Sequence, residues 1–161
     1  MQPLWRAQEE LQTMANALEI AKSSITAFND KDWNRMKALY ASDAVYDEKA
    51  TNRRIQGPQQ IIDGLQMWAT AFPDANGTIV RELVIGDVAV LELLWTGTQT
   101  GPLQTPTGTI PASNRAVELP ACSVIQVEGE RIKSDVHYFD LLTLLVQIGA
   151  AGATSGQSRA A

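Results

Sequence analysis

The chain has 161 residues, of which 45% are hydrophobic and 19% charged, as expected for one soluble domain that can bury a core. The formal net charge of −5 excludes the clustered basic surface that nucleic-acid binding needs, and no apolar run is long enough to span a membrane. The N-terminus is too polar for a signal peptide, and a single cysteine excludes internal disulfides and cysteine metal clusters, so we expect a cytoplasmic protein.

Three helices are predicted in the first half of the chain. The first has apolar residues at helical spacing and ends at Asn29 and Asp30; these residues are Leu11, Met14, Leu18, Ala21, Ile25 and Phe28. Asp32 can cap a short second helix. Pro58 suits the first turn of a third helix, which Pro73 ends.

The pattern then becomes that of β-strands. Residues 78–101 are rich in β-branched and aliphatic side chains and turn at Gly86-Asp87, which predicts a hairpin. Residues 101–114 contain three prolines and are expected to form a loop. Residues 115–127 and 130–139 predict two further strands. Asp140 precedes a short apolar helix that Gly149 ends.

This order predicts an α+β fold in which a curved antiparallel sheet wraps around N-terminal helices and a short C-terminal helix follows. We expect a single domain over residues 1–149. The small and polar residues 150–161 are expected to form a flexible C-terminal tail.

Several segments, in this order and spacing, resemble the SnoaL-like polyketide cyclase family of the NTF2-like superfamily. They are "AFNDKDWNRMKALYASDAVY", "GPQQIIDGLQMW", "WTGTQTG", "VEGERI" and "DLLTLLVQIG", and the resemblance covers about residues 15–149. It implies a cone-shaped fold with a pocket between sheet and helices, a homodimer through the outer sheet face, and cofactor-free acid/base chemistry on an apolar, carbonyl-containing substrate.

The chain departs from the family at three positions. In the family's cyclases an aspartate on the last strand relays a proton during aldol closure, and His137 occupies that position here. Gln99 and Ser123 stand where relatives carry pocket histidines. The resemblance therefore supports the pocket more strongly than it supports polyketide ring closure.

Asp135 and His137 share one face of the last strand, which is either exposed to solvent or lines the pocket. Imidazole gains and loses a proton near neutral pH, so His137 is the candidate acid/base group. Asp135 or Asp140 could orient it. Asp140 also directly precedes a helix, where its simplest role is to cap the first turn.

Glu92 interrupts the otherwise apolar strand "VAVLELLW". It either pairs with an arginine such as Arg81 or Arg115 at an edge, or lines the pocket as a second acid. Tyr46 is a candidate hydrogen-bond donor to a substrate oxygen, or a core residue. Asp47 and Glu48, which follow Tyr46, are expected to be solvated.

The leading hypothesis is a cofactor-independent cyclase or isomerase acting on a hydrophobic small molecule. It has His137, Asp135 and Asp140 as catalytic residues and Tyr46, Glu92, Gln99 and Ser123 in the substrate pocket. No cofactor and no metal are expected, because the chain lacks nucleotide-binding motifs and has one histidine. The alternatives are a non-catalytic small-molecule-binding or dimerisation module, and epoxide-hydrolase-type chemistry in the same pocket.

Overall fold

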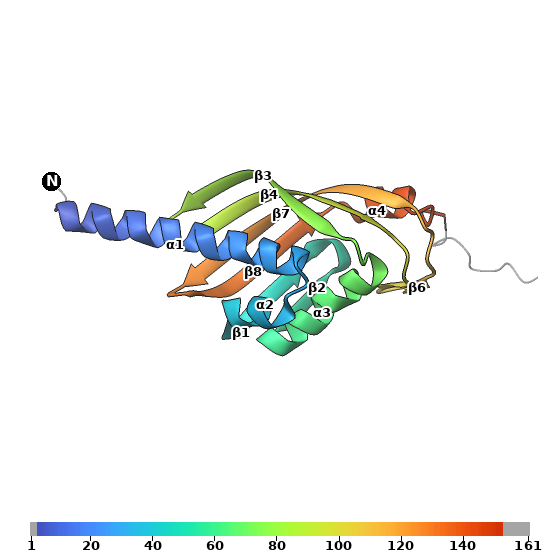
Figure 1. Ribbon diagram of the computed structural model, residues 1–161, viewed down its shortest axis with the longest axis horizontal. Helices are drawn as coiled ribbons and strands as arrows, with labels where there is room; N and C mark the ends of the chain where they lie inside the picture. Colours follow the sequence, from blue (N-terminus) through green and yellow to red (C-terminus); the bar gives the residue numbers. More distant parts are fainter. Residues whose placement is uncertain (1–2, 153–161) are drawn as a thin grey trace, which may run out of the picture.

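The computed structural model describes residues 3–152, which form helices packed on a curved sheet (Figure 1). The elements in chain order are α1 (Leu4–Asn29), α2 (Trp33–Leu39), β1 (Tyr40–Glu48), the 3-10 helix η1 (Lys49–Thr51), β2 (Arg53–Gln56), α3 (Pro58–Ala71), β3 (Asn76–Ile85), β4 (Val88–Thr98), β5 (Leu103–Thr105), β6 (Gly108–Ile110), β7 (Ala116–Glu128), β8 (Arg131–Phe139) and α4 (Leu141–Gln147). The predicted α+β class is confirmed.

The helices begin and end where their sequence signals lie. The Asp32 side chain accepts a hydrogen bond from Arg35 N at 3.0 Å and so caps α2, while Pro58 opens α3. The apolar side chains of α1 pack on the sheet only in its C-terminal half. The N-terminal half of α1 extends beyond the sheet, so its Leu4 and Leu11 side chains are exposed (Figure 1).

The main sheet has the strand order β2-β1-β8-β7-β4-β3. It is mixed, because β1 pairs with β8 in parallel, whereas the sequence predicted an antiparallel sheet that begins after α3. The strands β1 and β2 were not predicted, because β1 carries acidic residues at positions 43, 47 and 48 and β2 has only four residues. They place Tyr46 and Glu48 beside the last long strand.

The proline-rich segment after β4 contains a short hairpin, β5–β6, that packs against α3 through the buried side chain of Leu103. The expected tail boundary at residue 150 stays a prediction. Ala150 is buried against the end of α4, and residues 153–161 lie outside the described part of the chain. Within residues 3–152, no helix is both long and apolar enough to cross a membrane.

Candidate functional site

A cavity of about 100 Å³, here called the main cavity, lies between the inner face of the sheet and the helices. Its walls are largely aromatic and aliphatic; the phenylalanine and tryptophan side chains are Phe28, Trp68, Phe72, Trp95 and Phe139. The polar residues that line it are Ser24, Tyr40, Tyr46, Glu48, Thr96, Ser123, Asp135 and His137. An apolar enclosure with a few convergent polar groups is the usual form of a small-molecule site.

The pairing of β7 with β8 brings three of the predicted site residues together. Ser123 is directly opposite His137, and Asp135 is two residues from His137 on the same strand face. Ser123 Oγ and His137 Nδ1 form a hydrogen bond of 2.7 Å. All three side chains are buried and line the main cavity, so this face of β8 is not exposed to solvent.

His137 is 8% exposed and is surrounded by the rings of Tyr46, Trp95 and Phe139. Burial disfavours the imidazolium form and lowers the pKa of His137 to about 4, although the Glu48 charge acts in the opposite direction. The imidazole is therefore neutral at neutral pH. With Nδ1 bonded to Ser123, Nε2 is the ring nitrogen left to meet a ligand.

Asp135 is 5% exposed, and burial raises the pKa of its carboxyl to about 7. The nearby Ser123 and Tyr40 hydroxyls favour the ionised form and moderate this rise. The raised pKa of Asp135 and the lowered pKa of His137 mean that the carboxyl, and not the imidazole, changes its net charge near pH 7. Ser123 is the side chain that approaches both groups.

Three polar atoms in the main cavity are buried with no hydrogen-bond partner of good geometry among the described residues. They are Tyr40 Oη, Trp95 Nε1 and Asp135 Oδ1. Unpaired buried polar atoms are costly and uncommon in folded proteins, so a group of them in one cavity indicates that a ligand or water is meant to pair with them. Two of these atoms are donors and one belongs to a titrating carboxyl.

Tyr46 lies in the main cavity as the sequence analysis allowed, with its ring stacked 6.3 Å from that of His137. Its hydroxyl donates a long hydrogen bond of 3.5 Å to Glu48 Oε2. Burial, together with the Glu48 and Asp135 charges, raises the pKa of Tyr46 well above its usual value. Burial and Asp135 do the same for Tyr40. Both phenols therefore keep their protons at neutral pH and can donate hydrogen bonds.

Glu48 was expected to be solvated, and this expectation is wrong, because only 1% of it is exposed. Its Oε2 accepts hydrogen bonds from Arg53 Nη2 at 2.9 Å and Trp68 Nε1 at 2.8 Å, and Thr51 donates to Oε1. These donors come from η1, β2 and α3, so they compensate for the lost hydration of the carboxylate. The only sequence signal was the even spacing of Ala44, Tyr46 and Glu48 along β1.

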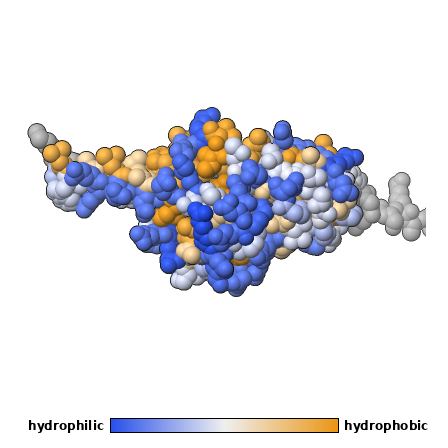
Figure 2. Space-filling view, viewed as in Figure 1, coloured by the Kyte–Doolittle hydropathy of each residue, from blue (hydrophilic) through white to orange (hydrophobic). Residues whose placement is uncertain are grey.

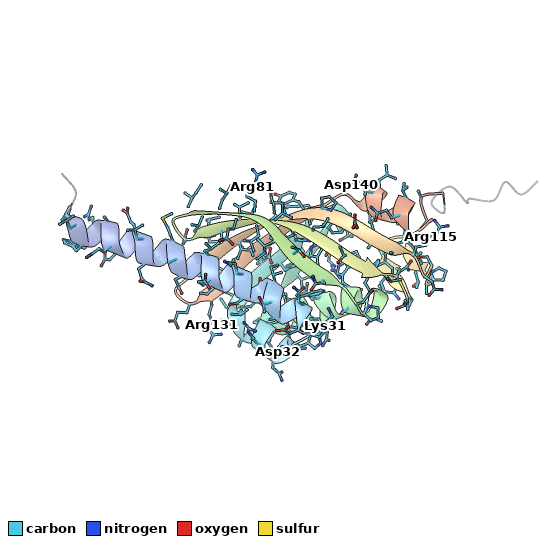
Figure 3. All side chains as sticks on the ribbon, turned by 45° about the horizontal axis from the view of Figure 1, so that its top comes forward. Lys31, Asp32, Arg81, Arg115, Arg131 and Asp140 are labelled. Carbon is cyan, nitrogen blue, oxygen red and sulfur yellow. The ribbon has the colours of Figure 1, made fainter. Side chains whose placement is uncertain are left out.

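Asp140 lies outside the main cavity, at the exposed start of α4 (Figure 3). Its carboxylate accepts hydrogen bonds from Leu142 N at 2.9 Å and Thr143 Oγ1 at 2.7 Å, which is the geometry of a helix cap. The Thr143 hydrogen bonds account for the lowered pKa of Asp140. The Asp140 carboxylate therefore does not contact the imidazole of His137.

Glu92 and Gln99 also lie away from the main cavity. Glu92 is on the outer face of the sheet, where Arg81 Nε pairs with it at 3.1 Å. Figure 3 labels Arg81. Of the two interpretations of Glu92, the ion pair is confirmed. Gln99 is fully buried because its amide ties a loop together: Nε2 donates to Pro111 O at 3.1 Å, and Ser113 N donates to Oε1. Both side chains instead interact with residues that are distant in sequence and lie outside the pocket.

No group of three His, Cys, Asp or Glu side chains among residues 3–152 is placed to hold a metal ion. The residue types that line the main cavity are suited to hydrogen bonding and proton transfer with an uncharged, largely apolar molecule.

The family model for the SnoaL-like polyketide cyclases matches residues 19–148. A comparison with curated protein sequences gave no significant match.

Solved structures share the fold. A protein from Jannaschia sp. CCS1 assigned as a SnoaL-like polyketide cyclase superposes with a TM-score of 0.77 at 18% identity, covering 85% of this chain and 94% of that one. A protein of ketosteroid isomerase-like fold from Catenulispora acidiphila DSM 44928, solved with trimethylamine, gives 0.69 at 24% identity, covering 81% and 92%. IdmH from Streptomyces antibioticus, assigned as a polyketide cyclase, gives 0.70 at 21%, covering 83% and 98%. The chain belongs to the SnoaL-like polyketide cyclase family.

Proposed function

We propose that this protein is a cofactor-independent acid/base enzyme of the cyclase or isomerase type, acting on an apolar small molecule that contains a carbonyl group. The observation that carries the proposal is the chain of Asp135, Ser123 and His137 in a buried cavity, with Ser123 Oγ 2.7 Å from His137 Nδ1. Family membership supports the same class of chemistry.

In the proposed reaction, His137 Nε2 removes a proton from the carbon next to the substrate carbonyl. The proton on Nδ1 passes to Ser123, and the Ser123 proton passes to Asp135. This transfer leaves both the imidazole and the hydroxyl neutral. Since the pKa of Asp135 is about 7, its carboxyl can both receive and return a proton near neutral pH.

The electrons left by the proton form an enolate, whose oxygen carries most of the charge. Tyr40 Oη and Trp95 Nε1 are buried donors with no hydrogen-bond partner of good geometry in the described chain, and they are the groups that we assign to this oxygen. Tyr46 supports His137 by stacking. Return of the proton to another carbon gives isomerisation, whereas attack of the enolate carbon on a second carbonyl gives ring closure.

The test is hydrogen–deuterium exchange at the methyl group of acetophenone in heavy water, followed by NMR, because exchange requires only the first proton transfer. His137→Gln and Asp135→Asn should each lower the exchange rate by about 10²- to 10⁴-fold. The control is Asp140→Asn, which keeps a helix-capping side chain and should leave the rate within about twofold. Equal rates in all four proteins would contradict the proposal.

A non-catalytic binding module remains the alternative of a different class. It would be favoured if the protein binds acetophenone but does not accelerate exchange. The neighbour from Catenulispora acidiphila was solved with trimethylamine, a small molecule, which fits either a binding or a catalytic role for a cavity of this kind.

We also propose a homodimer through the outer sheet face. The strand register places Leu83, Val90, Val124 and Val136 in one row across this face, and Leu83, Ile85 and Tyr138 are exposed. Figure 2 shows apolar side chains gathered around β3. Light scattering should give about twice the 17.5 kDa chain mass, and the monomer mass for Leu83→Lys. The cytoplasmic location also stays a prediction.

A further inference from the structure

A second cavity, of about 220 Å³, lies beside the main cavity and is here called the side cavity. It is formed between η1 and β2, the helix α3 and the β5–β6 hairpin, and its lining includes Thr51, Arg53, Met67 and Gln104. None of these four residues lines the main cavity, which holds about 100 Å³. The proposed proton transfer therefore takes place in the smaller of the two spaces.

Two residues, Glu48 and Trp68, line both cavities and so form the wall between them. Trp68 lies in the last turn of α3, and its Nε1 donates a hydrogen bond of 2.8 Å to Glu48 Oε2. A ligand in the main cavity could extend into the side cavity only by displacing this hydrogen-bonded pair. The wall therefore keeps the two spaces separate.

The Trp68 ring is also held by other aromatic rings. It stacks on Phe72 with 6.3 Å between the ring centroids, and it meets Phe139 edge-on at 5.6 Å. Glu48 is held in turn by Arg53 Nη2 at 2.9 Å. Since two rings and a well-paired carboxylate hold the indole, we infer that the wall is a fixed part of the main cavity.

This wall decides how large a ligand the main cavity can take. Small-molecule sites usually enclose about 300–1,000 Å³, and the main cavity lies well below that range. Without the Trp68 ring, the side cavity would be added to the main cavity and the space open to a ligand would more than triple. One side chain thus separates a site for a small molecule from a site of ordinary size.

We propose that Trp68 is a specificity-determining residue, which restricts the substrate to a small ketone by closing the main cavity towards the side cavity. Glu48 is its positioning residue, because it accepts the hydrogen bond from the indole. This inference rests on the proposed use of the main cavity for the reacting ketone.

The test compares acetophenone with hexanophenone, which has four more methylene groups, by isothermal titration calorimetry with the full chain. Methylene groups that enter an apolar space favour binding, so the longer ketone binds more tightly wherever its chain finds room. In the unchanged protein hexanophenone should bind no more tightly than acetophenone. In Trp68→Ala it should bind at least about tenfold more tightly, because its chain can enter the side cavity.

The matched control is Met67→Ala, because Met67 precedes Trp68 on α3 and lines only the side cavity. This variant enlarges the side cavity without opening the wall, so the ratio of the two dissociation constants should stay as in the unchanged protein. The double variant Trp68→Ala/Met67→Trp refills the side cavity and should return the ratio to about one.

Trp68→Phe keeps an aromatic ring for packing but is smaller and lacks the Nε1–H. It should give a ratio between those of the unchanged protein and Trp68→Ala, which provides a test that does not depend on the alanine variant folding.

Tighter binding of hexanophenone than of acetophenone to the unchanged protein would overturn the inference. A ratio in Trp68→Ala equal to that in Met67→Ala would do so too, as would the absence of acetophenone binding. Acetophenone exchange reports on the proposed reaction separately. Exchange that depends on His137, together with either of the first two results, would remove only the role of Trp68. The expected ratios without exchange would support the size limit and contradict only the reaction.

Discussion

The main cavity contains two buried carboxylates whose surroundings differ. Glu48, on β1, receives hydrogen bonds from Arg53, Trp68 and Thr51. Asp135, on β8, has one oxygen with no partner of good geometry, and burial raises the pKa of its carboxyl to about 7. The Glu48 carboxylate thus has several hydrogen-bond donors at one end of the cavity, whereas the Asp135 carboxyl at the other end has an unpaired oxygen and a raised pKa.

Burial alone therefore does not identify an acid/base residue. A carboxylate with several donors has a structural role, because protonation would weaken the hydrogen bonds that compensate for its burial. A carboxylate without them gains from protonation and becomes available for proton transfer. Changes that remove charge at the two ends should therefore affect stability with opposite sign.

The largest effect is expected at the anchored end. Arg53→Met leaves the buried Glu48 carboxylate without its cationic partner and should lower the free energy of unfolding by about 3–5 kcal/mol. Urea denaturation at pH 7 measures it. Arg54→Met breaks an ion pair whose Arg54 side chain is exposed and leaves Asp47 paired with Lys49, so it should cost less than about 1 kcal/mol. Losses of similar size in both variants would contradict the comparison.

At the titrating end the expected sign is reversed. In the unfolded chain Asp135 ionises near its ordinary pKa of 3.8, and in the folded protein near 7, so stability falls as the pH rises through this range. Asp135→Asn removes this loss and should stabilise the protein at pH 8 by roughly 4 kcal/mol. The gain should shrink towards pH 4. Destabilisation at pH 8 would show that the carboxylate is paired after all.

His137 should impose the opposite dependence on pH. Its pKa is about 4 when folded and 6.5 when unfolded, so stability is lost as the pH falls from 6.5 to 4. In this window the Asp135 and His137 slopes oppose each other. His137→Gln should therefore uncover a fall in stability with rising pH of about 1.4 kcal/mol per unit. Thermal melts between pH 4 and 6.5 would measure this slope. If His137→Gln leaves the dependence of stability on pH unchanged, the two residues do not have opposing effects.

A smaller effect is expected at the start of α4. Asp140→Ala removes two hydrogen bonds to the first turn of this helix and should cost about 1 kcal/mol of unfolding free energy. Asp140→Asn should recover most of it. A drop in acetophenone exchange to the level of His137→Gln would instead return Asp140 to the catalytic group.

The smallest effect is expected on the outer face. Glu92→Gln breaks an ion pair in which both side chains are largely exposed, so unfolding free energy should change by less than about 1 kcal/mol. Urea denaturation at pH 7 measures this change. A large change would mean that this face is covered, as in the proposed dimer. The measured change in unfolding free energy should then depend on protein concentration.

Local patterns in the sequence predicted much of the fold. The helical spacing in α1, the Asp32 and Asp140 caps, and the turn at Gly86-Asp87 each depend on residues a few positions apart, so they can be recognised without the structure. The strand period also placed Asp135 and His137 on one face. The family resemblance directed attention to that face.

The tertiary structure decided what these residues do. The burial of Glu48 depends on Arg53 and Trp68, which lie 5 and 20 positions later in the chain, and the position of Ser123 depends on the register between β7 and β8. Glu92 and Asp135 are both acidic residues in strands, yet one meets Arg81 and the other meets an aromatic cavity. Local sequence patterns were sufficient to predict the helices, the main hairpins and a strand face with two titratable groups. Only the fold decided which carboxylate is anchored and which can exchange a proton, because desolvation and hydrogen bonding depend on neighbours that are distant in sequence.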